Sequence, residues 1–203
     1  MYPSTQDADA VLLRVSEFFE GESDVHKTAE SLARRLREEG IDFALAGALA
    51  LGAHGAVRAT ADVDVLIGRE GLARFKERWL GRGYLELRPG GRPVRDTETH
   101  VRIDFLIAGD YPGDGRAKPV CFPDPKLAAV LSGSYPVISL PKLVELKLAS
   151  GMSAPHRLQD LADVLRLVRV RSLPLELEQE LDLSVRPKYR ELWQAAQAPA
   201  EEY

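Results

Sequence analysis

The sequence has one cysteine, few aromatic residues and no long apolar run, and each scarcity excludes a class of protein. With Cys121 alone, an intramolecular disulfide is impossible, and a reducing compartment is expected. The four histidines do not combine with Cys121 into zinc-site spacing. No apolar run reaches the roughly 18 residues of a membrane span, and the polar start lacks the basic beginning of a signal peptide. We therefore expect a cytoplasmic protein with no membrane partner.

Basic charge is not in excess either. The formal net charge of -4 argues against a broadly basic nucleic-acid binder, although a local basic patch would be compatible with it. The hydrophobic fraction of 45% is ordinary, and 203 residues suit one domain with a helical appendage. Function is therefore expected in a local motif and not in bulk charge.

The strongest functional signal lies between residues 43 and 67. Residues 43–46 form a short apolar run that predicts a buried strand, and the Ala-rich residues 48–53 favour a helix. Gly47 stands where the strand hands over to the helix, and such a junction directs free backbone N–H groups toward an anion. A tight turn would explain Gly47 equally well if it stood alone. Its interpretation depends on the acids that follow.

Two of these acids lie in a predicted strand, residues 62–67. Side chains alternate between the faces of a strand, so Asp62 and Asp64 point to the same side. Two adjacent carboxylates repel each other unless a positive charge lies between them, and their hard oxygen atoms suit Mg²⁺ or Mn²⁺. A solvated polar face of an edge strand is the plainer alternative for an isolated pair.

A third acid lies in another predicted strand, residues 101–107. Arg102, Asp104 and Leu106 share one face of this strand. A lone acid in an apolar strand costs stability unless it has a partner. A metal ion shared with Asp62 and Asp64 would supply that partner.

The spacing of Ala46-Gly47-Ala48 and Asp62-Val63-Asp64-Val65 resembles the signature of the DNA polymerase β-like nucleotidyltransferase superfamily. Arg58 and Thr60, within RATADVD, resemble the form found in minimal nucleotidyltransferases and AbiEii-type toxins. The resemblance implies an α+β fold, with a mixed β-sheet flanked by helices and a helical C-terminal part. It also implies that Asp104 completes a catalytic triad. Ala48 departs from the usual Gly or Ser, so a hydroxyl is missing there, and backbone N–H groups would have to serve.

The C-terminal part adds a lysine within an apolar helix stripe. A helix is predicted from Pro141 to about residue 150, and Lys147 falls on the same stripe as Leu143 and Val144. A lysine at such a position either extends to the surface or meets an anion. It resembles the lysine with which AbiEii-like relatives contact nucleotide phosphates.

The next predicted helix carries acids that resemble an R-x-K-D-x-x-D pattern, with Gln159 in place of the lysine. Asp160 is a candidate nucleotide-binding residue, and a surface ion pair with Arg157 is the equal alternative. For Asp163 a surface role is the favoured interpretation. The expected buried stripe consists of Leu158, Leu161, Ala162, Leu165 and Val168.

Three regions are predicted along the chain. Residues 1–40 would form N-terminal helices, including one at residues 8–19, that pack on the core. Residues 41–139 would form the nucleotidyltransferase core, with the loop at residues 110–124 as a candidate substrate gate. Residues 140–203 would form the helical C-terminal region.

Together these features predict a metal-dependent nucleotidyltransferase that moves an NMP group from an NTP to an acceptor hydroxyl. The expected cofactor is Mg²⁺ or Mn²⁺, and the expected catalytic and metal-binding residues are Asp62, Asp64 and Asp104. The expected nucleotide-binding residues are Gly47, Ala48, Arg58, Thr60, Lys147 and Asp160. A tRNA end, a protein or a small molecule is compatible as acceptor, and an AbiEii-type toxin would have a cognate antitoxin as partner. A non-catalytic nucleotide-binding or protein-interaction module of the same fold is the alternative.

Overall fold

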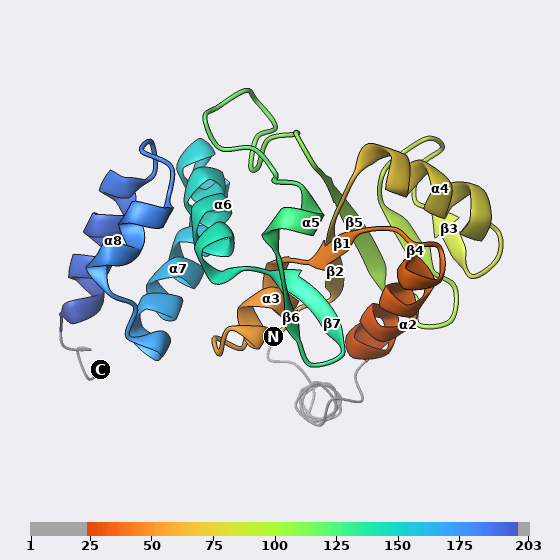
Figure 1. Cartoon of the computed structure of the whole chain (residues 1–203), viewed down its shortest axis with the longest axis horizontal. Helices are drawn as coiled ribbons and strands as arrows, with labels where there is room; N and C mark the ends of the chain where they lie inside the picture. Colours follow the sequence, from red (N-terminus) through yellow and green to blue (C-terminus); the bar gives the residue numbers. More distant parts are fainter. Residues whose placement is uncertain (1–23, 199–203) are drawn as a thin grey trace, which may run out of the picture.

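A mixed seven-stranded sheet forms the centre of the protein, which a computed structural model describes over residues 24–198 (Figure 1). The helix expected at residues 8–19 lies outside the described residues. The strands are β1 (Phe43–Leu45), β2 (Asp62–Ile67), β3 (Tyr84–Glu86), β4 (Val94–Asp96), β5 (Arg102–Ile107), β6 (Ala129–Ser132) and β7 (Tyr135–Ile138). They lie in the order β3-β4-β5-β2-β1-β7-β6.

Helices flank this sheet at both ends. They are α2 (Asp24–Glu38), α3 (Gly47–Ala53), α4 (Arg69–Trp79), α5 (Pro125–Ala128), α6 (Leu140–Ser153), α7 (Leu158–Arg171) and α8 (Arg186–Gln197). In Figure 1, α2 and α4 lie toward one end of the sheet, and α6, α7 and α8 stand together at the other. The expected α+β architecture, a mixed sheet flanked by helices with a helical C-terminal part, is confirmed.

The pairing of the central strands is what positions the site. β1 runs antiparallel to β2 and parallel to β7, and β2 runs parallel to β5. Because the chain passes through α4, β3 and β4 between β2 and β5, the two parallel strands can lie side by side. Residues of β2 and β5 that are register partners therefore point to the same face of the sheet.

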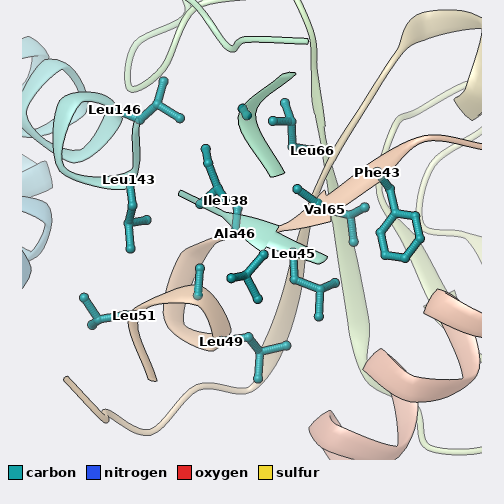
Figure 2. Packing of buried hydrophobic residues seen from close by; sticks show 14 of the residues in the cluster. Phe43, Leu45, Ala46, Leu49, Leu51, Val65, Leu66, Ile138, Leu143 and Leu146 are labelled. Atoms are coloured by element: carbon teal, nitrogen blue, oxygen red, sulfur yellow. The ribbon is translucent and has the colours of Figure 1, made fainter. Parts of the chain in front are cut away.

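The hydrophobic core is continuous from the sheet to the first C-terminal helix. Figure 2 shows side chains of β1, α3, β2, β7 and α6 packed together. Leu45 and Val65 are fully buried between the central strands, and Leu143 and Leu146 of α6 are buried against the same cluster. α6 is therefore held by the core that also holds β2, which fixes one wall of the site relative to the other.

The hairpin formed by β6 and β7 was not predicted from the sequence. β7 begins at Tyr135, and Leu140 already belongs to α6. Pro136 lacks an N–H, and proline is rare in a central strand, which hides this hairpin from a pattern search.

α6 also continues to Ser153 instead of ending at Gly151. A Cβ atom at Gly151 would lie 2.6 Å from the Leu161 side chain, so glycine here allows α6 and α7 to approach closely. Gly151 therefore serves helix packing and not helix termination.

The predicted buried stripe of α7 is confirmed at Val168 but wrong at Leu158 and Ala162, which are exposed. Leu158 is 67% exposed, and the buried residues are Asp163, Val164, Leu167 and Val168. The helix is turned so that Asp163 faces α6, where Lys147 neutralises it. The buried face of α7 therefore contains an ion-paired acid, Asp163, where helical periodicity predicts only apolar side chains.

Within residues 24–198, every helix is too short or too polar to cross a membrane.

Candidate active site

The register of β2 and β5 brings the three predicted acids onto one face of the sheet. Asp64 pairs with Asp104, and Asp62 pairs with Arg102. Val63 and Ile103 are likewise partners and point into the core on the opposite face. The period of two along each strand therefore produces a two-by-two block of charged side chains, three acidic and one basic.

This block forms one wall of a cleft of about 580 Å³. α6 and the segment leading into α7 line the cleft as well, together with parts of the loop between β5 and α5. The charged residues that line it are Arg58, Asp62, Asp64, Arg92, Arg102, Asp104, Lys147, Arg157 and Asp160. Basic side chains thus surround the acidic block, which suits a ligand that carries phosphate groups.

Asp64 is the most strained charge of the site. Burial, together with the neighbouring carboxylates of Asp62 and Asp104, raises its pKa from 3.8 to about 6, and burial is the largest cause. Lys147 and Arg58 act in the opposite direction and do not cancel the effect. A carboxylate with a raised pKa among like charges is stabilised in its ionised form by any cation that enters the cleft.

Gly47 allows the loop after β1 to lie directly over Asp64. Its φ of +55° belongs to the left-handed region that favours glycine. A Cβ atom at this position would lie 1.8 Å from Asp64 Oδ2, so no other residue fits. The backbone N–H of Ala46 also donates to the carbonyl of Asp64 at 2.9 Å. The Gly47 backbone is thereby fixed against the most strained carboxylate.

Thr60 and Asp62 form a local pair just before and at the start of β2. Thr60 Oγ1 donates to Asp62 Oδ1 at 2.6 Å. Thr60 does not line the cleft, and neither does Ala48, which is buried in α3. The structure therefore places Thr60 where it orients Asp62, and it places Ala48 in the packing of α3.

Asp104 is held by its own strand neighbour. Arg102 Nε donates to Asp104 Oδ2 and Arg102 Nη2 to Asp104 Oδ1, each at 2.7 Å. The hydrogen bonds to Asp104 raise the pKa of Arg102. The Arg102 side chain is 51% exposed, so its guanidinium can leave Asp104 without disturbing the core. The sequence placed Arg102 on this face but gave no sign of the pairing.

The donor set fits a divalent cation at Asp62 and Asp64 but not at all three acids together. Among residues 24–198, no group of three or more His, Cys, Asp or Glu side chains is arranged to hold a metal ion. Arg102 accounts for this, because it occupies both oxygens of Asp104. Mg²⁺ commonly takes only one or two carboxylates and completes its shell with water and substrate phosphates. Asp62 and Asp64, with Asp64 destabilised as an anion, match that requirement.

The opposite wall is a polar network between α6 and α7. Lys147, only 6% exposed, donates to Asp163 Oδ2 at 2.6 Å and to Asp160 Oδ1 at 3.1 Å. Ser150 Oγ donates to Asp160 Oδ2 at 2.7 Å. The Asp160 carboxylate therefore pairs with Lys147 and Ser150, and not with Arg157, the alternative partner considered from the sequence. Arg157 instead donates to the carbonyl of Gly113 at 3.4 Å.

The surface role favoured for Asp163 is wrong. Its side chain is 1% exposed and accepts hydrogen bonds from Lys147, from Gln159 at 3.0 Å and from Arg58 at 3.3 Å. Arg58 belongs to the loop before β2, so the Asp163 carboxylate joins that loop to both helices. The sequence signal for this arrangement was Lys147 itself, because a lysine in an apolar stripe calls for a buried acid.

Seven of the nine predicted site residues line the cleft: Gly47, Arg58, Asp62, Asp64, Asp104, Lys147 and Asp160. Thr60 does not line the cleft but contacts Asp62, which does. Ala48 does not line the cleft either. The sequence interpretation missed Arg92 and Ser150, which line the cleft, and the role of Asp163 behind it.

No protein-family model and no curated protein matches this chain. The solved structures that are similar to this chain include the following two. The antibiotic-resistance factor ANT(2'')-Ia is 14% identical, with a TM-score of 0.48 over 83% of this chain and 95% of its own. An antigenic nucleotidyltransferase-like protein from Paracoccidioides brasiliensis is 15% identical, with a TM-score of 0.46 over 86% and 93%. At these values the likeness assigns no function, which has to be argued from the site.

Proposed function

We propose that this protein is a metal-dependent nucleotidyltransferase, which transfers an NMP group from an NTP to an acceptor hydroxyl. The observation that carries the proposal is the placement of Asp62, Asp64 and Asp104 on one face of two paired strands, in a cleft that basic side chains also line. Burial and the like charges of Asp62 and Asp104 raise the pKa of Asp64 to about 6. Such strain is expected where a site is built to bind a cation together with phosphate groups.

Each wall of the cleft has a part in this proposal. Asp62 and Asp64 would hold Mg²⁺ or Mn²⁺, which when bound would neutralise charge on the phosphate oxygens. Gly47, without a side chain, lets its backbone lie against Asp64 at the edge of the cleft, where backbone N–H groups would face the phosphates. Lys147 and Arg58 would donate hydrogen bonds to the outer phosphates and stabilise the pyrophosphate as it leaves.

Asp104 would act on the acceptor substrate. Once Arg102 has moved away, the Asp104 carboxylate would accept a hydrogen bond from the attacking hydroxyl and orient it. A bond forms between the hydroxyl oxygen and the α-phosphorus, and the bond from that phosphorus to the pyrophosphate oxygen breaks. The hydroxyl proton passes to Asp104 or to solvent.

The acceptor is proposed only as a class: a hydroxyl at a tRNA end, on a protein or on a small molecule. An AbiEii-type toxin that works in the cytoplasm beside a cognate antitoxin is the biological setting that the sequence resemblance implies. Co-expression with the neighbouring gene product, scored as relief of growth arrest, would test that setting separately from the chemistry.

A non-catalytic nucleotide-binding module is the second candidate, and one observation favours it. Arg102 donates to both oxygens of Asp104, so the third carboxylate of the cleft is already engaged in an ion pair. If this pair never opens, the cleft can still bind a nucleotide through Lys147 and Arg58. It would lack the carboxylate that orients the attacking hydroxyl.

Incubation with Mg²⁺, each labelled NTP and cell lysate separates the two candidates. Label that appears on a macromolecule or metabolite, with release of pyrophosphate, supports transfer. NTP binding without transfer supports the module. Asp64→Asn should abolish transfer, whereas Asp42→Asn, at an exposed acid beside β1, should not change it. Transfer that survives in Asp64→Asn would contradict the proposal.

A further inference from the structure

Asp163 is a buried charge that the proposed chemistry leaves without a role. It does not line the cleft, but it contacts two cationic residues that do, Lys147 and Arg58. Both cations donate to the same atom, Asp163 Oδ2, at 2.6 and 3.3 Å. The other oxygen accepts from Gln159 at 3.0 Å. One carboxylate thus joins α7 to α6 and to the loop before β2.

Because the Asp163 carboxylate is buried, it depends on its cationic and hydrogen-bonding partners. An ionised carboxylate with 1% exposure is tolerated only when charge and hydrogen bonds compensate it. Burial alone would raise the pKa of Asp163, but Lys147, Gln159 and Arg58 outweigh burial and lower it. Asp163 is therefore ionised at neutral pH and holds both cations in one geometry.

We propose that Asp163 is a positioning residue, which fixes Lys147 and Arg58 so that their remaining N–H groups face the ligand phosphates in the cleft. The proposal rests on the proposed function for what the ligand is. The anchoring itself rests only on the contacts of Asp163.

A count of donors supports this role. The Lys147 ammonium has three N–H groups, and among residues 24–198 two acceptors meet it, Asp163 and Asp160. The third N–H is left for a ligand. The Arg58 guanidinium uses Nε for Asp163 and Nη1 for the carbonyl of Ala59 at 3.3 Å. Within the same residues its Nη2 has no acceptor, and Arg58 also lines the cleft.

Anchoring matters because free lysine and arginine side chains have many rotamers. Ordering each of them costs conformational entropy when a ligand arrives. Asp163 orders both side chains before the ligand binds, which is the condition for strong electrostatic stabilisation of a transition state. Asp160 and Asp163 also offset the charges of Lys147 and Arg58. The helical wall of the cleft therefore offers oriented N–H donors with little excess positive charge.

Glu145 offers a matched control for the experiment. It is buried to a similar degree, at 5% exposure, and it belongs to the same helix as Lys147. Glu145 accepts from Lys142 and from the backbone N–H of Asp182, each at 2.7 Å, and it does not line the cleft. Glu145→Gln therefore removes a comparable buried charge without touching the proposed anchor.

The first measurement concerns the anchor alone. The folded protein, checked by circular dichroism, is treated briefly with an amine-acylating reagent, and the modification of Lys147 is read by peptide mass spectrometry. In Asp163→Asn we expect Lys147 to react about 10-fold faster, since its ammonium loses a charge-assisted hydrogen bond that keeps it from the reagent. Glu145→Gln should react like the wild type. Equal Lys147 reactivity in all three proteins would overturn the proposal. If Asp163→Asn does not fold, Asp163→Glu should keep Lys147 protected, and exposure of Lys147 in that variant would overturn it too.

The second measurement concerns the phosphates and uses a double-mutant cycle. In the transfer assay, Asp163→Asn should lower kcat about 10- to 100-fold, the usual effect of losing a residue that orients a site group. Combined with Lys147→Met, it should cost little more than Lys147→Met alone, because both act through one group. Glu145→Gln combined with Lys147→Met should be additive. Additivity for Asp163 as well would refute positioning.

The two assays distinguish a failure of the proposed function from a failure of the positioning role. If the wild type transfers no label from any NTP, the proposed function fails, and the same cycle is then measured on NTP binding. If the wild type transfers label but Asp163→Asn matches it, the proposed function stands and the positioning role fails.

Discussion

Asp64 and Asp163 are acids associated with opposite walls of one cleft, and their electrostatic surroundings are opposite. On the sheet wall, burial and the carboxylates of Asp62 and Asp104 raise the pKa of Asp64 to about 6. On the helical wall, Lys147, Gln159 and Arg58 overcome burial and lower the pKa of Asp163. One acid is short of positive charge, and the other is fully compensated by its own chain.

The difference separates charges that serve structure from charges that await a ligand. A protein can neutralise a buried acid internally, as α6 and the loop before β2 do for Asp163. It gains nothing in stability by leaving Asp64 among like charges. Asp64 is therefore the better candidate for direct contact with a cation, and Asp163 for holding other groups in place.

The largest expected effect comes from removing the strained charge. Asp64→Asn keeps the shape of the side chain but removes the charge that would hold the cation, so transfer should fall about 10²–10³-fold or more. Asp62→Asn should behave alike, because the two side chains share one face. The measurement is the initial rate with labelled NTP and Mg²⁺. Asp42→Asn, an exposed acid outside the cleft, is the control and should keep the wild-type rate.

Removing the compensated acid should instead damage stability. Asp163→Ala leaves Lys147 and Arg58 without their shared acceptor, and loss of one partner of a buried ion pair typically costs about 3–5 kcal/mol. Urea unfolding at pH 7 measures this cost. Because the pKa of Asp163 is lowered on folding, its contribution is present at neutral pH and is lost as pH falls below about 4. A gap between wild type and variant that stays constant down to pH 2 would contradict this account.

The sheet wall could be predicted in part from the sequence. The alternation of apolar and charged residues placed Asp62 and Asp64 on one face, and Arg102 and Asp104 on another strand's face. That these two faces are one surface depends on the parallel pairing of β2 with β5, across an intervening α4, β3 and β4. Local patterns carry no information about such a pairing, so the resemblance to a known family had to supply the expectation.

The helical wall was predicted less well, for a physical reason. Helical periodicity assigns charged residues to solvent, and this assumption placed Asp163 on the surface and Leu158 in the core. Both placements are wrong, because Asp163 is buried in an ion pair with Lys147 and Leu158 is 67% exposed. Gly47 was identified for phosphate binding, but its close contact with Asp64 follows only from three-dimensional packing.

A smaller effect sharpens the comparison through pH. Because folding raises the pKa of Asp64 from 3.8 to about 6, the folded protein holds this proton more tightly than the unfolded chain. Stability from this group is therefore greatest below about pH 4, falls as pH rises toward 6 and is level above. In metal-free buffer at pH 8, Asp64→Asn should be more stable than wild type by roughly 1–2 kcal/mol, allowing for partial exposure of the side chain. The gain should vanish near pH 4. Added Mg²⁺ should stabilise the wild type and not the variant, and equal stabilisation of both would argue against a cation at Asp64.

The smallest effect concerns the guanidinium that separates Asp104 from the other two acids. Arg102→Gln should release both oxygens of Asp104 and offer a cation a third carboxylate on the same face. Breaking a half-exposed ion pair costs no more than about 1 kcal/mol, so Mn²⁺ affinity without nucleotide should rise about two- to fivefold. Isothermal titration calorimetry measures this affinity. Arg92→Gln is the matched control, since Arg92 lines the same cleft and is similarly exposed but pairs with Asp110. If both variants gain equally, the effect is general charge and Arg102 has no special hold on the site. If only Arg102→Gln gains, the opening of one surface ion pair decides whether the cleft presents two carboxylates or three.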